Sequence, residues 1–219
     1  FGGHRRPYRR RLPNVLARGQ ANRKEPEETN KRELVMKIAI ATDHRGYAMK
    51  EKVVSLLTEQ GHEVLDMGTN SSKSCDYPDM GYEAAKLVAE GIADRGILLC
   101  GTGIGMSIVA NKIPGVRAAI CNDELTAKMS RRHNDANVLC LASDVLGEEM
   151  MRRIVTSWLE TDFESGGRHE RRVKKIECIE RGLPPTACNE PKKNKSNNAI
   201  LSQRPAADAL DNQARLPES

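Results

Sequence analysis

The chain has 219 residues, of which 38% are hydrophobic and only 3% aromatic, and its formal net charge is +5. Such a low aromatic content indicates that part of the chain lies outside a packed core. No apolar run approaches the length of a membrane-spanning helix, and the first residues lack the apolar stretch of a secretory signal. The composition therefore speaks against a membrane protein and against a secreted one.

The positive charge is concentrated near the N-terminus. Residues 1–35 hold ten Lys or Arg and four Asp or Glu, whereas residues 36–182 hold twenty and twenty-two. We therefore expect no nucleic-acid surface on the folded part. Residues 1–35 are predicted to be a disordered basic extension, with a targeting or RNA-binding arm as the alternative. Since Met36 directly precedes the first predicted strand, we expect the native chain to start there or the arm to be accessory.

Cysteine spacing bears on metal binding and on the redox compartment. The six cysteines form no C-x-x-C pair, which argues against a zinc ribbon or a redox motif; they are Cys75, Cys100, Cys121, Cys140, Cys178 and Cys188. Reduced thiols in a cytoplasmic protein are the expectation.

Hydrophobic periodicity predicts alternating strands and helices. The predicted strands cover 36–42, 62–67, 97–99, 116–121 and 138–141, and the predicted helices cover 47–60, 80–90, 106–112, 124–132, 147–159 and 168–181. Gly61 is expected to follow the first helix as its C′ residue, and Asp123 to cap the fourth. This order predicts one α/β domain over 36–182, a five-stranded parallel sheet with helices on both faces. Residues 183–219 lack an amphipathic period, so a disordered tail is predicted there.

The stretch from Ile97 to Ser107, ILLCGTGIGMS, is the centre of the predicted site. A buried parallel strand here runs into Cys100 and then into a glycine loop that precedes a helix. Ligands of open α/β sheets bind at such carboxyl ends. The glycine spacing is neither G-x-G-x-x-G nor a P-loop, so a nest of N–H groups for a small oxyanion fits better. The alternative is a tight turn with a buried structural cysteine.

Polar residues follow other predicted strands. Asp43 and His44 come after the first strand, and Cys100 and Thr102 after the third, so these four side chains are expected to share a pocket at the carboxyl edge of the sheet.

Two arginines near the end of the folded part form a second candidate. Arg168 and Arg172 lie four residues apart on one helical face, which suits a phosphate group. The alternative is a solvated face in which they pair with Glu164 or Glu170.

Several motifs occur together in one order: Asp43-His44-x-Gly46, Asp76-Tyr77-Pro78, Cys100-Gly101-Thr102-Gly103-Ile104-Gly105, Asn111-Lys112, Gly115-x-Arg117-Ala118, Arg132-His133-Asn134-x-x-Asn137 and Gly166-Gly167-Arg168-His169-x-x-Arg172. Over about residues 36–182 this set closely resembles ribose-5-phosphate isomerase type B, whose family also contains galactose-6-phosphate and allose-6-phosphate isomerases.

The resemblance implies a fold and a reaction. The implied fold is a three-layer α/β/α sandwich, Rossmann-like, in a homodimer or homotetramer with active sites at the subunit interface. The implied reaction interconverts ribose 5-phosphate and ribulose 5-phosphate through a cis-enediolate, with neither metal nor cofactor, in the non-oxidative pentose phosphate pathway. The expected partner is a small-molecule sugar phosphate.

The resemblance also implies roles for individual residues. Cys100 would be the base, since relatives without this cysteine use a Glu a few residues later, where this chain has Met106. His133, with Asp43, would open the sugar ring. The enediolate would be held by Thr102 and by N–H groups of the loop that contains Gly101, Gly103 and Gly105. The phosphate would be bound by His44, Arg168 and Arg172, with Arg117 as a further candidate, and the sugar would be lined by Tyr77 and Asn134.

Two alternatives to this function stay open. A hexose 6-phosphate isomerase acting on allose or galactose 6-phosphate would use the same loop chemistry, and pocket depth cannot be read from the sequence. A non-catalytic phosphosugar-binding module would need no base, so the presence of Cys100, Thr102 and His133 together argues against it.

Overall fold

A computed structural model describes residues 35–188 of the chain. Most of the predicted N-terminal extension and of the predicted C-terminal tail lies outside these described residues. None of the helices between residues 35 and 188 has the length and apolar character needed to cross a bilayer.

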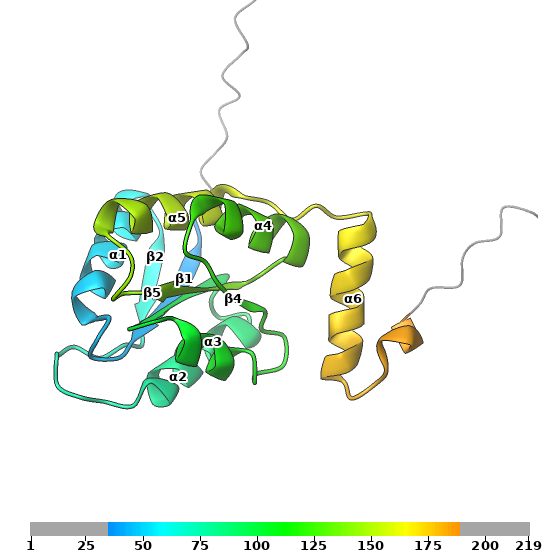
Figure 1. The fold of residues 1–219 in the computed structure, drawn as a ribbon, viewed down its shortest axis with the longest axis horizontal. Helices are drawn as coiled ribbons and strands as arrows, with labels where there is room; N and C mark the ends of the chain where they lie inside the picture. The colour runs from blue at the N-terminus through cyan, green and yellow to red at the C-terminus, as the bar shows by residue number, and fades with distance from the viewer. Residues whose placement is uncertain (1–34, 189–219) are drawn as a thin grey trace, which may run out of the picture. The chain divides into compact units, whose positions relative to one another are not determined.

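One parallel sheet forms the centre of the domain. Its strands are β1 (Lys37–Thr42), β2 (Glu63–Asp66), β3 (Arg95–Cys100), β4 (Ala118–Ile120) and β5 (Val138–Ala142). Their order is β2-β1-β3-β5-β4, so β3 lies in the middle with β1 and β5 beside it (Figure 1). The five-stranded parallel sheet that the apolar runs predicted is confirmed.

Helices cover both faces of this sheet (Figure 1). The helices that follow its strands are α1 (Tyr47–Glu59), α2 (Tyr77–Ala89), α3 (Ile104–Ala110), α4 (Glu124–Asn134) and α5 (Glu148–Glu160). α1, α4 and α5 pack on one face, and α2 and α3 on the other. The predicted three-layer α/β/α arrangement is therefore confirmed.

The two faces of the sheet differ in side-chain size. Large aliphatic residues and Trp158 fill the face under α1, α4 and α5, where Ile97 and Leu99 point. Alanines and cysteines dominate the other face, where Leu98 and Cys100 point. This alternation along β3 follows from the two-residue period of a strand. Cys100 therefore lies on the face with the smaller side chains.

Local capping agrees with the predictions at two helix ends. The Asp123 carboxylate accepts a hydrogen bond from the Thr126 N–H at 2.7 Å, which caps α4. Gly61 follows α1 with a φ of 79°, a left-handed conformation that glycine adopts without strain. The start of α2 was predicted three residues too late. Pro78 lies in its first turn, where a proline costs no hydrogen bond.

The last two elements, α6 (Arg168–Glu180) and the 3₁₀ helix η1 (Pro185–Cys188), follow the strands and helices of the sandwich. α6 packs beside α4, and the Glu180 carboxylate accepts a hydrogen bond from the Gly115 N–H at 2.8 Å. The first residues of the predicted disordered tail are thus folded, so the domain extends at least to Cys188.

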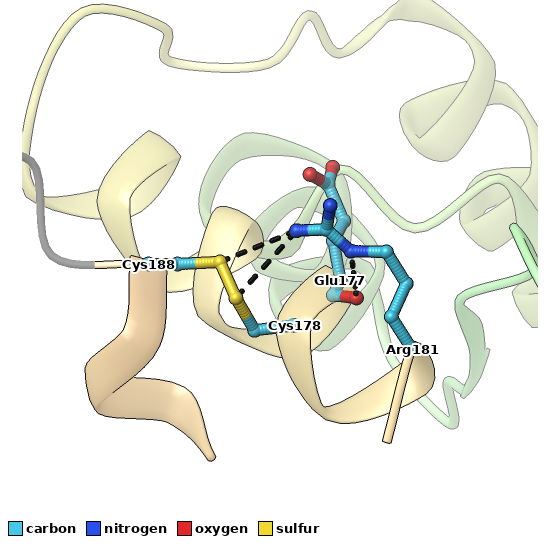
Figure 2. The surroundings of a disulfide bond; sticks show 4 residues. All are labelled: Glu177, Cys178, Arg181 and Cys188. Atoms are coloured by element: carbon cyan, nitrogen blue, oxygen red, sulfur yellow. Dashed lines mark hydrogen bonds between the residues drawn. A yellow bond between two sulfur atoms is a disulfide. The ribbon is translucent and has the colours of Figure 1, made fainter. Parts of the chain in front are cut away.

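A disulfide joins α6 to η1 (Figure 2). Cys178 and Cys188 have Cα atoms 6.2 Å apart, and the Arg181 guanidinium donates to both sulfur atoms. The prediction that all the thiols are reduced is therefore wrong for this pair. A search for C-x-x-C motifs misses cysteines ten residues apart that meet only because the chain turns back after the helix. Cys75, Cys100, Cys121 and Cys140 are free, as predicted.

Candidate active site

The carboxyl ends of β1, β3 and β5 meet at one edge of the sheet. Asp43 and His44 directly follow β1, and Cys100 is the last residue of β3. Thr42 pairs with Leu99 in the sheet register, and Cys100 pairs with Ala142 on the other side. The structure therefore places Asp43, His44, Cys100 and Thr102 at the same edge, here called the Cys100 edge.

Cys100 is only 5% exposed, and its sulfur is in contact with the glycine loop. The Sγ accepts a hydrogen bond from the Gly103 N–H at 3.2 Å. Such a donor favours the thiolate over the thiol. Gly103 has a φ of 74°, and a Cβ there would also lie 3.3 Å from the backbone of Leu141. Only glycine fits at this position without strain, so the loop is both a tight turn and a donor to the thiol.

The other two loop glycines lie beneath side chains. A Cβ on Gly105 would lie 2.6 Å from the Tyr77 ring, and one on Gly101 would lie 2.6 Å from a carboxylate oxygen of Asp144. Tyr77 thus packs directly on the loop, next to the predicted oxyanion position. The hydroxyl of Thr102 is exposed and accepts a hydrogen bond from the Ile104 N–H at 3.4 Å.

Backbone donors hold the two side chains that follow β1. One carboxylate oxygen of Asp43, which is buried, accepts from the N–H groups of Arg45 and Gly46 at 3.0 and 3.3 Å. The Nδ1 of His44 accepts from the Cys75 N–H at 3.3 Å. Because Nδ1 is used as an acceptor, Nε2 is the ring nitrogen of His44 that is left for a ligand.

A second group of predicted residues lies where α4 ends and α6 begins, and is here called the His133 group: His133, Asn134, Arg168, His169 and Arg172. The rings of His133 and His169 stack, with centroids 4.0 Å apart and planes 5° apart. The Arg168 Nε donates to the His169 Nε2 at 3.1 Å. Burial lowers the pKa of His169, and the neighbouring His133 and Arg168 lower it further. The pKa of His169 is thus held below its ordinary value by burial and by neighbours that carry or can gain positive charge.

Within one chain, the Cys100 edge and the His133 group are on opposite sides of the domain. α4 begins just after the carboxyl end of β4 and ends just before the amino end of β5. Its eleven residues span about 16 Å at 1.5 Å per residue. His133 therefore lies near the amino edge of the sheet, and the structure does not bring it to Asp43 or Cys100 of the same chain.

Arg117, the further phosphate candidate, is held by the end of α4. Its guanidinium donates to the Asp135 carboxylate at 2.7 Å and to the carbonyl oxygens of Asn134 and Asp135. Asp135 has a φ of 47°, which is unusual for a residue with a side chain. Arg117 therefore fixes the turn that carries Asn134.

The solvated-face alternative for Arg168 and Arg172 named two glutamates as their partners. Glu164 instead accepts from the Arg132 Nε at 2.9 Å, and Glu170 pairs with Lys174 at 3.1 Å. Both carboxylates are thus engaged by other cations, which weakens that alternative.

A cavity of about 440 Å³ lies between α6, α4 and β4. Its lining is mostly apolar and includes Val116, Ala118, Ile176 and Ile179, with Arg117 and Asn134 at its border. The cavity is therefore next to the His133 group and not at Cys100.

One group of side chains has the composition of a metal site. His133, Glu164 and His169 offer ligand atoms that lie within 4.8 Å of one another. The two imidazole rings are nearly parallel, however, so the lone pairs in their planes do not converge on one point. Arg132 already binds Glu164, and Arg168 donates to His169. This excess of positive charge suits an anion better than a cation.

Sequence reasoning missed three residues at the Cys100 edge. Arg45 and Asp144 form an ion pair there, and the buried hydroxyl of Ser143 has no hydrogen-bond partner among the residues described. Ser143 and Asp144 follow β5 as Asp43 follows β1. A search for polar residues directly after each predicted strand would therefore have found Ser143 and Asp144, had it included the last strand.

Comparisons with known proteins bear on both groups of residues. A family model described as Ribose/Galactose Isomerase matches residues 38–176. Ribose-5-phosphate isomerase B of Escherichia coli (strain K12) is 49% identical over 144 residues, which are 66% of this chain and 96% of that protein. The solved structure of ribose-5-phosphate isomerase B from Clostridium thermocellum is 50% identical and has a TM-score of 0.66 over 67% of this chain and 99% of that one.

A further solved structure, ribose-5-phosphate isomerase B from Mycoplasma genitalium with bound ribulose 5-phosphate, is 41% identical. It has a TM-score of 0.64 over 66% of this chain and 96% of that one. The family model covers nearly all of the sheet, the glycine loop after β3 and most of α6, and every motif of the predicted resemblance lies within residues 38–176. The chain therefore belongs to the ribose/galactose isomerase family.

Proposed function

We propose that this chain interconverts ribose 5-phosphate and ribulose 5-phosphate by aldose–ketose isomerisation. The observation that carries the proposal is Cys100 at the carboxyl end of the central strand, with a loop N–H donating to its sulfur. The related proteins are ribose-5-phosphate isomerases B, one of them solved with bound ribulose 5-phosphate, and this supports the substrate. The reaction belongs to the non-oxidative pentose phosphate pathway, and we place it in the cytoplasm.

In the proposed reaction, the Cys100 thiolate removes the proton from C2 of the open-chain aldose. The electron pair of that C–H bond forms the C1–C2 double bond of a cis-enediolate, and the aldehyde oxygen takes up negative charge. Loop N–H groups near Gly101 and Gly105, with Thr102, stabilise this charge. A proton then passes from the C2 hydroxyl to the C1 oxygen. As the C2 carbonyl forms, the electron pair of the C1–C2 double bond takes the proton back from Cys100 at C1, which gives the ketose. A thiol with a reference pKa of about 8.5 is a usable base near neutral pH.

Ring opening and phosphate binding need the His133 group. Ring opening requires proton transfer at the ring oxygen and at the anomeric hydroxyl, which we assign to His133 and Asp43. Arg168, Arg172 and His44 bind the phosphate, because guanidinium groups donate to it in a bidentate fork. Tyr77 and Asn134 line the sugar.

These assignments require two copies of the chain. Since the Cys100 edge and the His133 group lie at opposite edges of the sheet in one chain, a complete site combines the Cys100 edge of one copy with the His133 group of another. Exposed apolar side chains on α3 and α6 offer surface for such contacts, namely Ile104, Ile108, Ile176 and Ile179. We therefore propose a homodimer, or a homotetramer built from such dimers, with shared active sites.

A substrate panel tests the proposal. Purified protein is assayed with ribose 5-phosphate, allose 6-phosphate and galactose 6-phosphate, and the ketose formed is measured directly. We expect the highest kcat/KM with ribose 5-phosphate. A higher value with either hexose phosphate would reassign the substrate within the family. Binding of all three without turnover would instead indicate a phosphosugar-binding module.

A further inference from the structure

An ion pair crosses the end of the central strand at the Cys100 edge. Arg45, in the turn after β1, donates from its Nε to a carboxylate oxygen of Asp144 at 2.9 Å and from its Nη2 to the same oxygen. Asp144 lies in the turn after β5. Because β1 and β5 flank β3, this pair spans the carboxyl end of the strand that carries Cys100.

The pair lies directly on the residue that follows Cys100. A Cβ on Gly101 would lie 2.6 Å from the Asp144 oxygen and 2.7 Å from the Arg45 Nε. Backbone hydrogen bonds fix both turns in this place. The Asp144 N–H donates to the Gly101 carbonyl at 3.0 Å, and the Arg45 N–H donates to Asp43. The two charges are thus held beside Gly101, the neighbour of Cys100 in the chain, by turns that the backbone fixes.

Charged and titratable groups reach Cys100 from several elements. Asp43, His44 and Arg45 come from the turn after β1, while Asp144 follows β5 and Cys140 lies on β5 itself. Tyr77 comes from α2 and lies on the glycine loop, and α3 (Ile104–Ala110) contributes no charged residue.

Electrostatic interactions connect the arginine to the thiol. Asp144, through its hydrogen bond and its charge, raises the pKa of Arg45 above its ordinary value, and Asp43 and Cys100 add to this rise. A charge interaction is reciprocal, so an Arg45 cation that is stabilised by the Cys100 thiolate stabilises that thiolate equally.

We propose that Arg45 and Asp144 are positioning residues that together set how readily Cys100 loses its proton. The Arg45 cation favours the thiolate, and the Asp144 anion offsets most of that effect. The balance matters because a thiolate that is too stable is a poor base for a carbon-bound proton. This inference rests on the proposed role of Cys100 and adds two residues to it.

Alkylation of the native protein tests the inference. Iodoacetamide labelling of Cys100 is followed across pH by peptide-resolved mass spectrometry, and the midpoint of the rate against pH is compared between variants. Asp144→Asn should lower the midpoint and Arg45→Gln should raise it, each by about half a pH unit for charges that are partly exposed. The double variant should return close to the native midpoint, and Arg45→Lys, which keeps the charge, should stay near it.

Two controls separate electrostatics from damage to the fold. Glu59→Gln removes a comparable exposed partner, that of Arg152 between α1 and α5, and should leave the Cys100 midpoint unchanged. In 1 M salt the shifts of the two single variants should shrink, because exposed charges are then screened. If Asp144→Asn does not fold, as judged by its thermal unfolding, the Gln and Lys variants of Arg45 decide the question alone.

The outcomes also distinguish this inference from the proposed function. If Asp144→Asn and Arg45→Gln leave the midpoint of Cys100 alkylation unchanged, or shift it in the same direction, the inference is wrong and the ion pair is only a structural contact. The midpoint of Cys100 alkylation is measured without substrate. If the native protein does not isomerise ribose 5-phosphate, the proposed function is refuted, but the alkylation result can still be interpreted.

Discussion

The Cys100 edge and the His133 group are built in different ways. At the Cys100 edge, backbone N–H groups hold the key side chains: Gly103 donates to the thiol, and two residues of the next turn donate to Asp43. In the His133 group, side chains hold one another through a ring stack and a guanidinium donor, next to a mostly apolar cavity. The first region is held together by the backbone of one chain, whereas the second is the region for which we propose a contact with a second chain.

This difference suggests a division of labour. Chemistry on a carbon-bound proton needs a base fixed to within a fraction of an ångström, and turns anchored to a parallel sheet supply such rigidity. Phosphate binding tolerates more movement, because a guanidinium can follow its ligand. Four experiments test this division, beginning with the one for which we expect the largest effect.

Removing the base should have the largest effect. Cys100→Ser keeps the shape of the side chain but replaces the thiol with a far less acidic hydroxyl, so kcat should fall by about 10²–10⁴-fold while sugar phosphate still binds. Steady-state kinetics and a binding titration check this together. Cys75→Ser is the matched control, since it removes a free thiol but keeps the backbone N–H that donates to His44, and it should leave kcat unchanged. Near-native turnover in Cys100→Ser would mean that another group takes the proton, with Asp43 the next candidate.

Mixing two inactive variants tests whether the regions meet across two chains. Cys100→Ser and His133→Ala proteins are mixed, exchanged by mild unfolding and refolding, and assayed. In a dimer with shared sites, one site of each mixed dimer is intact, so activity should recover to about a quarter of native. Each variant treated alone is the control and should stay inactive. Absence of recovery in mixtures that sedimentation proves to be mixed dimers would place both groups in one chain.

Loss of one phosphate ligand should have a smaller effect. Arg168→Ala should raise KM by roughly tenfold, the amount expected for one charge-assisted hydrogen bond. Part of the loss should appear in kcat if the contact strengthens in the transition state. Lys174→Ala is a suitable comparison, because that lysine pairs with Glu170 on the same helix. Equal kinetics in the two variants would return Arg168 to a solvated helix face.

Acid should weaken the His133 group through His169. Because burial lowers the pKa of His169 in the folded protein, protons bind the unfolded state more readily, and stability is lost as the pH falls from about 6.5 through the lowered value. Above that range this histidine contributes no pH dependence. We expect the drop in Tm between pH 7 and pH 5 to be smaller in His169→Gln by a few degrees at most. An identical drop in both proteins would show that His169 does not titrate in this range.

Much of the Cys100 edge could be predicted from sequence, and physical reasons explain why. Apolar runs locate the strands of a buried parallel sheet, and the carboxyl ends of such strands converge whatever their order. Asp43 and Cys100 were therefore placed at one edge before the strand order was known. The glycine loop was recognised from its spacing, although the closeness of Tyr77 to Gly105 depends on how α2 packs and has no local signal.

The His133 group was less predictable from the residues alone. The stack of His133 on His169 joins two helices through a tertiary contact, and periodicity along either helix says nothing about it. The pairing of Cys178 with Cys188 depends likewise on a turn after α6 that was not predicted from the sequence. Spacing alone suggested phosphate binding by Arg168 and Arg172, whereas only the family resemblance gave His133 and Asn134 their expected roles.

The unequal size of the side chains on the two faces of the sheet has a consequence for access. Alanines such as Ala39, Ala41 and Ala84 line the face under α2 and α3, and a Cβ on Gly81 would lie only 2.8 Å from the Met106 sulfur. The layer on that side is therefore thin. Cys100 lies on that side at the carboxyl edge of the sheet, so its sulfur packs among small side chains and against the glycine loop. The face under α1, α4 and α5 is filled by large side chains around Trp158, and this layer provides the rigidity that supports the thinner one.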